Sequence, residues 1–154
     1  MTVVVGVDGS PDSFAAIRLA KQEAAYRGVG LAAVMAYISD STLGTPAGRP
    51  IATPKAVDEQ RKTAESSLRQ AIADALGSDD GVALRVEAGV PGRVLVHTAR
   101  ILDADLVVLA TRKEHAPSRL LGAVSQYVLR NAPCPVMVVP DVRKSLSGNR
   151  SSSG

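Results

Sequence analysis

The chain has very few residues of the types that bind metals or form disulfides. Its one cysteine, Cys134, can form no internal disulfide, which is typical of proteins in a reducing compartment. Its two histidines, His97 and His115, lie far apart and offer no paired spacing for a structural zinc site. We therefore predict no metal site and expect a cytoplasmic protein.

Aromatic residues are also scarce, at 3% of the chain with no tryptophan. Modules that stack nucleic-acid bases need aromatic platforms, so this scarcity argues against a nucleic-acid partner. The formal charge of +3 does not argue for one, because the three basic residues and one acidic residue of positions 141–154 account for +2 of it. The interior must be filled by Val, Leu, Ile and Ala, as in a parallel sheet covered by helices on both faces.

Long apolar runs are missing too. No stretch approaches the roughly 20 apolar residues of a membrane-spanning helix, and the opening MTVVVGVDGS lacks a basic segment followed by a long apolar one. We expect no membrane partner. A chain of 154 residues can bury one core of ordinary size but not two, so we predict one domain.

Short β-branched runs alternate with segments of helical periodicity. Ser10 is a candidate helix cap rather than a nucleophile, with Pro11 at the first helical position and Gly28 at the end. Further helices are expected from about residue 55 to Gly77, after GVPG, and at about 119–131. Strands are expected at about 2–8, 31–38, 82–88, 105–110 and 136–139.

This alternation predicts an α/β fold: a five-stranded, parallel, doubly wound sheet in a single domain over residues 1–140. Residues 39–54 are expected to form a long loop between elements, and the polar residues 141–154 are expected to be a flexible tail. Ligands of such sheets bind beyond the carboxyl ends of the strands, where the strand order reverses. That rule selects Asp8–Ser10 and the segment from Ala110 to Gly122.

Three segments stand at places where they match a known family: VVVGVDGS, GVPGRVLVHTARILDADLVVLATR and LLGAVSQYVLRNAPCPVMVVP. On these segments the chain resembles the universal stress protein family over about residues 1–140. The resemblance implies a small stress-response or regulatory protein. The family's ATP-binding members carry glycine, two residues, glycine, nine residues, glycine and then serine or threonine after the fourth strand.

This chain departs from that motif at several positions. Ala110 and Lys113 stand where the first two glycines belong, eight residues instead of nine precede Gly122, and Ala123 replaces the hydroxyl residue. Glycine allows backbone N–H groups to approach phosphate oxygens closely, which side chains at 110 and 113 oppose. We therefore predict a degenerate adenine-nucleotide site with weak or no binding of ATP, and of Mg²⁺ with it.

Part of the site is retained. Asp8 matches the family's acidic residue for the adenosine half, although an Asp before Gly-Ser-Pro is equally interpreted as a turn former. Arg112, Lys113 and Arg119 add positive charge where phosphates would sit, or form an ordinary solvated loop. The candidate cofactor-binding residues are Asp8, Gly9, Val34, Ala110, Arg112, Lys113, Gly122, Ala123, Val124 and Ser125.

We expect a binding module rather than an enzyme, because no general base or nucleophile stands out. The alternatives are a genuine ATP-binding member with slow hydrolysis, which would need a Mg²⁺-binding group beside the phosphates, and a flavin-binding domain, which the scarcity of aromatics disfavours. His97 is interpreted as a packed or half-exposed side chain and Cys134 as a small buried one. An apolar edge strand and the resemblance both predict a homodimer through Val136, Met137, Val138 and Val139.

Overall fold

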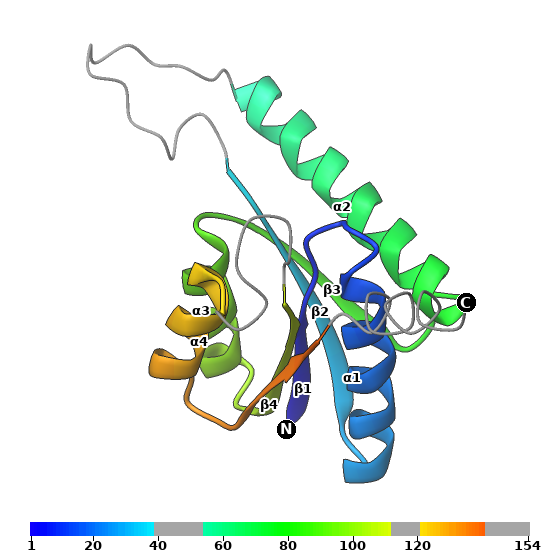
Figure 1. Ribbon diagram of the computed structural model, residues 1–154. Coiled ribbons are helices and arrows are strands. Elements are labelled where there is room, and N and C mark those ends of the chain that lie inside the picture. The colour runs from blue at the N-terminus through cyan, green and yellow to red at the C-terminus, as the bar shows by residue number, and fades with distance from the viewer. Residues whose placement is uncertain (39–53, 112–120, 141–154) are drawn as a thin grey trace, which may run out of the picture.

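The computed structural model describes residues 1–38, 54–111 and 121–140. Strands and helices alternate along these residues, as Figure 1 shows. The predicted long loop and polar tail lie outside the described residues. The elements are β1 (Thr2–Gly6), α1 (Ser13–Arg27), β2 (Gly30–Tyr37), α2 (Pro54–Leu76), β3 (Val82–Ala88), α3 (Pro91–Ile101), β4 (Ala104–Ala110), α4 (Ala123–Asn131) and β5 (Val136–Val139).

The strands form one five-stranded sheet in the order β3-β2-β1-β4-β5, and every pair is parallel. This confirms the predicted fold class. In the central strand β1, Val4 lies opposite Ala32 of β2 and Val107 of β4. The chain moves outward from β1 to β3 and then returns to the other side of β1, so the strand order reverses between β1 and β4. The carboxyl ends of these two strands therefore flank the crevice where ligands bind in such sheets.

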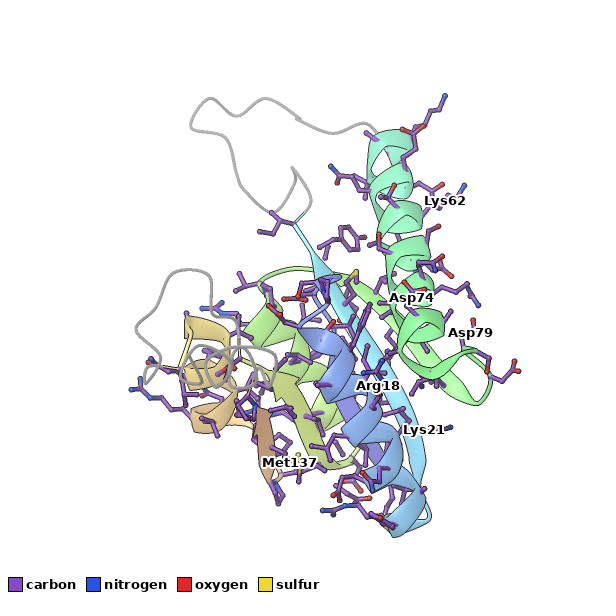
Figure 2. All side chains as sticks on the ribbon, turned by 45° about the vertical axis from the view of Figure 1, so that its right-hand side comes forward. Arg18, Lys21, Lys62, Asp74, Asp79 and Met137 are labelled. Atoms are coloured by element: carbon purple, nitrogen blue, oxygen red, sulfur yellow. The ribbon has the colours of Figure 1, made fainter. Side chains whose placement is uncertain are left out.

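The helices cover the two faces of the sheet in pairs. Residues of α1 and α2, such as Ile17 and Leu68, share one buried cluster with the sheet, whereas α3 and α4 contribute Leu95 and Val128 to the other. Both clusters are aliphatic, as the composition requires. Figure 2 shows charged side chains of α2, including Lys62, on the outer side of that helix. Each helix thus buries one apolar stripe and leaves its polar face in solvent.

The first turn differs from the prediction. Strand β1 ends at Gly6 rather than at residue 8, and α1 begins at Ser13 without a side-chain cap. The hydroxyl of Ser10 donates to Asp8 Oδ1 at 2.6 Å, and the N-cap residue of the helix is Asp12 rather than Ser10. Pro11 lies in the turn, where its carbonyl accepts a hydrogen bond from the Phe14 N–H at 3.2 Å. The predicted cap was wrong because the carboxylate of Asp8, two residues earlier, holds the Ser10 N–H and hydroxyl in the turn.

The last helix also begins later than predicted, at Ala123 instead of about residue 119. Gly122 is its N-cap, with an extended backbone (φ −66°, ψ 168°), and its carbonyl accepts the Gln126 N–H at 3.0 Å. This shift places Gly122, Ala123, Val124 and Ser125 together at the amino end of α4. Over the described residues, no helix is long and apolar enough to cross a membrane.

Thr98 of α3 offers a test of the packing. Its side chain is fully buried, and its hydroxyl has no hydrogen-bond partner within the described residues. Because an unsatisfied buried hydroxyl is unfavourable, Thr98→Val is expected to raise the free energy of unfolding by about 1 kcal/mol in urea denaturation. Thr63→Val is the control: its hydroxyl donates to the carbonyl of Glu59 at 2.9 Å on an exposed surface, and no gain is expected. A loss of stability in Thr98→Val would contradict the prediction.

Candidate functional site

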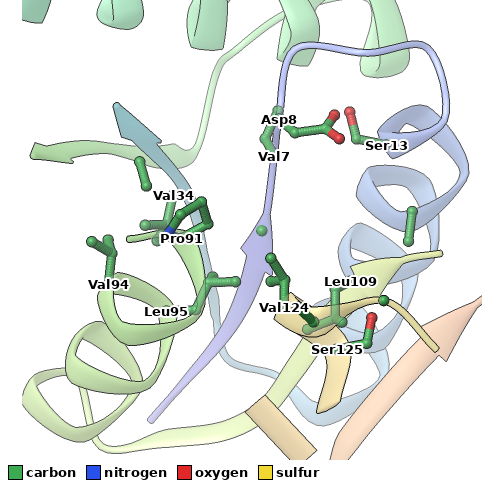
Figure 3. Close-up of a pocket in the computed structure, with 15 residues that line it drawn as sticks. Val7, Asp8, Ser13, Val34, Pro91, Val94, Leu95, Leu109, Val124 and Ser125 are labelled. Atoms are coloured by element: carbon green, nitrogen blue, oxygen red, sulfur yellow. The ribbon is translucent and has the colours of Figure 1, made fainter. Parts of the chain in front are cut away.

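A cavity of about 220 Å³ lies at the carboxyl ends of β1 and β4, at the point where the strand order reverses. Its walls come from β1, β2, β4 and the amino ends of α3 and α4, as Figure 3 shows. Apolar side chains line most of it, among them Val34, Leu95 and Leu109. An apolar slot of this kind suits the apolar part of a small ligand, and the polar groups at its edge would fix the ligand's orientation.

Gly6 brings strand and helix close together on this side of the sheet. A Cβ atom at Gly6 would lie 2.9 Å from Leu95 Cδ1, closer than side chains approach one another. The absence of that Cβ lets α3 pack against the end of β1 and keeps the cavity open. Sequence reasoning did not identify Gly6, because its role depends on a contact between distant elements.

Asp8 stands at one edge of the cavity. Its Oδ1 accepts hydrogen bonds from the Ser10 N–H at 2.9 Å and the Ser10 hydroxyl at 2.6 Å. Gly9 has φ +82°, the left-handed conformation that glycine adopts most readily, and so lets the chain turn directly after Asp8. In Figure 3 the carboxylate extends across the turn toward Ser13. Asp8 therefore forms the turn and also lines the cavity; the two interpretations are compatible.

The amino end of α4 forms the opposite edge. The first intrahelical bond is that of Gln126, and the N–H groups of Ala123, Val124 and Ser125 have no acceptor within the described residues. Three such donors, together with the positive end of the helix dipole, favour an anion. The site thus combines an apolar slot, a carboxylate on one side and an anion-attracting helix end on the other.

The structure brings together most of the predicted site residues. Gly9 forms the adjoining turn without lining the cavity, and Arg112, Lys113 and Arg119 lie outside the described residues. The GVPG turn before α3 was the signal that could have pointed to that helix. The lining residues that were not predicted are Gly6, Val7, Ser13, Ala36, Pro91, Val94, Leu95 and Leu109. The predicted residues that do line the cavity are Asp8, Val34, Ala110, Gly122, Ala123, Val124 and Ser125.

Cys134 and His97 lie away from the cavity. Cys134 is half-buried; burial raises the pKa of its thiol, the charge of Asp105 adds to the rise, and a hydrogen bond with the backbone of Val107 partly offsets it. A raised pKa disfavours the reactive thiolate, which agrees with a packing role. The His97 side chain is exposed on α3, neither packed nor half-exposed as predicted. Among the described residues, no three His, Cys, Asp or Glu side chains are grouped to hold a metal ion.

A parallel sheet with helices on both faces and a cavity at the reversal point defines a doubly wound α/β domain. The model of the universal stress protein family matches residues 1–140, so the chain belongs to the universal stress protein family. It is 33% identical over 143 residues to a universal stress protein of Mycolicibacterium smegmatis, covering 89% of this chain and 47% of the other. The chain thus spans about half the length of that relative.

Solved structures of the family agree with the fold. The universal stress protein UspA of Lactobacillus plantarum is 26% identical with a TM-score of 0.70, over 90% of this chain and 97% of that one. A universal stress protein solved in complex with cAMP is also 26% identical, with a TM-score of 0.66, over 92% of this chain and 97% of the other. At least one protein of closely similar fold therefore binds an adenine nucleotide.

Proposed function

We propose that this protein is a small cytoplasmic regulatory module that holds the adenosine part of a nucleotide in the cavity and binds ATP weakly or not at all. The observation that carries the proposal is the apolar cavity with Asp8 at one edge and the amino end of α4 at the other. The relative with bound cAMP supports an adenine ligand. The single cysteine supports the cytoplasm as its location.

Two residues of the cavity disfavour a triphosphate. Ala110 ends β4 in the lining, and it carries a Cβ where the family's motif has a glycine. Ala123, the first residue of α4, has no hydroxyl to contact a phosphate or its Mg²⁺. The lack of a hydroxyl at position 123 also supports a binding module rather than an enzyme. Mg²⁺ would come only with a bound polyphosphate.

Calorimetry with ATP tests the proposal. The unaltered protein is expected to bind ATP far more weakly than micromolar. A loop rebuilt with Gly at 110 and 113, one inserted residue and Ser at 123 should gain at least about tenfold in affinity, since charge-assisted hydrogen bonds become geometrically accessible. Asp8→Ala in the rebuilt protein should abolish the gain.

Submicromolar ATP binding by the unaltered protein would contradict the steric argument and favour the alternative of a genuine ATP-binding member. A phosphate-release assay then separates a binder from an enzyme. Steady release of phosphate at saturating ATP would refute the non-enzymatic part of the proposal, and no release would support it.

We also propose that the functional unit is a homodimer joined through β5. Among the described residues β5 is an edge strand, and Met137 stands on it at the side of the sheet in Figure 2. Val136, Met137 and Val138 are half-buried within the protomer, and Val139 is buried. An apolar edge strand with unpaired backbone groups favours pairing with a second copy about a two-fold axis.

A further inference from the structure

The two helices that cover one face of the sheet, α3 and α4, carry charge of one sign. Their sequences contain the arginines Arg93, Arg100 and Arg130 and no aspartate or glutamate. The helices on the other face differ, because both α1 and α2 contain acidic as well as basic residues. Only the pair α3 and α4 therefore leaves its positive charge without an acidic residue in the same helices.

The three arginines lie on one surface of the protein. Arg93 and Arg100 are both exposed, and their spacing of about two helical turns, or roughly 10 Å along the axis, puts them on the same side of α3. Arg100 reaches across to the neighbouring helix, where its Nη2 donates to the carbonyl of Asn131 at 3.2 Å. Arg130, the residue before Asn131, is exposed on α4, which lies beside α3 in Figure 1.

Tyr127 adds an apolar contact between the two helices. A Cβ atom at Gly92 would lie 3.0 Å from Tyr127 Cδ1, so the ring packs across the amino end of α3 while 37% of the residue stays exposed. Tyrosine and arginine are residue types that are enriched at protein interfaces. We name this surface the α3–α4 face; it consists of Arg93, His97, Arg100, Tyr127 and Arg130.

The arginines of the α3–α4 face have no acidic partner. None of them forms an ion pair with a residue that the structure describes, whereas Arg27 of α1 pairs with Glu23 and Lys62 of α2 pairs with Asp58. Like charges that are held close together repel one another, and a bound group of opposite sign removes that repulsion. The face therefore favours a partner that supplies carboxylates.

We propose that the α3–α4 face docks an acidic segment of a partner protein, a helix with two carboxylates about two turns apart and an apolar residue between them. Carboxylates at that spacing meet Arg93 and Arg100, whose guanidinium groups form bidentate pairs with such acids. The apolar side chain contacts the ring of Tyr127. This inference goes beyond the proposed function and does not depend on a ligand in the cavity.

A protein segment fits the α3–α4 face better than a nucleic acid does. Single-stranded nucleic acids bind along basic grooves in which several aromatic side chains stack on successive bases. The face has one exposed aromatic residue, Tyr127, and its arginines cover only about two helical turns. It therefore has room for a few carboxylates but lacks a continuous track for a phosphate backbone.

Fluorescence anisotropy with a labelled peptide tests the proposal. The probe is a helical peptide of about 15 residues with glutamates two turns apart on either side of a leucine. At low ionic strength we expect the unaltered protein to bind it with a dissociation constant on the order of 100 μM, since exposed charges are then screened least. A peptide with serine in place of the leucine should bind about threefold more weakly, because the contact with Tyr127 is lost. No binding at millimolar peptide would overturn the inference.

The triple variant Arg93→Gln, Arg100→Gln and Arg130→Gln tests the residues. We expect it to bind the peptide at least about tenfold more weakly, because each exposed ion pair contributes a factor of up to about five. Arg93→Gln alone should weaken binding about threefold, and it leaves the contact of Arg100 with α4 in place should the triple variant fail to fold. Unchanged binding by Arg93→Gln would refute its role.

A control with the same change in net charge separates the α3–α4 face from the charge of the whole protein. Lys55→Gln, Arg61→Gln and Lys62→Gln remove three exposed cations from α2, where acidic residues are interleaved. This control should bind the peptide like the unaltered protein, and an equal loss in both triple variants would overturn the inference. Tighter binding of a single-stranded DNA of the same charge would contradict a protein partner. Adenosine binding is measured separately in each variant, so failure of this inference leaves the proposed function standing.

Discussion

Proline at position 138 is expected to convert the proposed dimer into monomers while leaving the protomer folded. The Val107 N–H donates to the carbonyl of Pro135 and the Thr111 N–H to that of Val139. The backbone N–H and C=O groups of one strand residue point to the same side of the strand. The odd-numbered residues of β5 therefore face β4, and the N–H groups of its even-numbered residues point to the open edge. Val138→Pro thus removes a donor that only a partner strand would use.

Because a two-fold axis repeats the substitution on both protomers, the dissociation constant of the dimer is expected to rise at least about 100-fold. Light scattering at micromolar concentration measures it. Val86→Pro is the matched control. It lies on β3, the opposite edge strand. The Gly89 N–H donates to the carbonyl of Tyr37 in β2 at 2.9 Å, so the N–H groups of the even-numbered residues of β3 again point to the open edge. The control should remain dimeric, and a monomeric unaltered protein would refute the dimer itself.

Much of the fold could be predicted because its signals are local. Each strand is a short run of aliphatic residues, and strands such as β4 (Ala104–Ala110) that are covered on both faces contain hardly any polar residue to obscure the pattern. Because helices alternate with the strands, parallel pairing through right-handed crossovers is the expected topology. The predicted element boundaries were wrong where polar side chains form local hydrogen bonds with the backbone. At Ser10, for example, the N–H and the hydroxyl both donate to Asp8 Oδ1.

The candidate site could be predicted only in part. Asp8 and the residues from Gly122 to Ser125 were found because strand ends and helix starts have local signatures and the family motif covers them. The contribution of α3 was missed because Val94 and Leu95 are ordinary core residues by pattern. Only the packing of α3 against β1 turns them into walls of a cavity, and no periodicity in the sequence encodes which core residues border a void.

Gly6 is where that packing has its largest functional effect, and Gly6→Val is expected to abolish binding of adenosine and AMP. A Cβ at Gly6 would meet Leu95 Cδ1 at 2.9 Å and Leu95 Cδ2 at 3.1 Å, so the side chain of Leu95 must move. Valine is compatible with a strand, and the added methyl groups together with a displaced Leu95 enter the cavity.

Affinity for the ligand is expected to fall at least about 100-fold, because these side chains take up the space in the cavity that the adenine ring needs. The free energy of unfolding should fall by only about 1–3 kcal/mol, as for other overpacked cores. Gly30→Val is the matched control, since Gly30 begins β2 and a Cβ there meets nothing within 4 Å. Calorimetry should find binding unchanged in the control. Binding that survived in Gly6→Val would show that the ligand occupies a place other than this cavity.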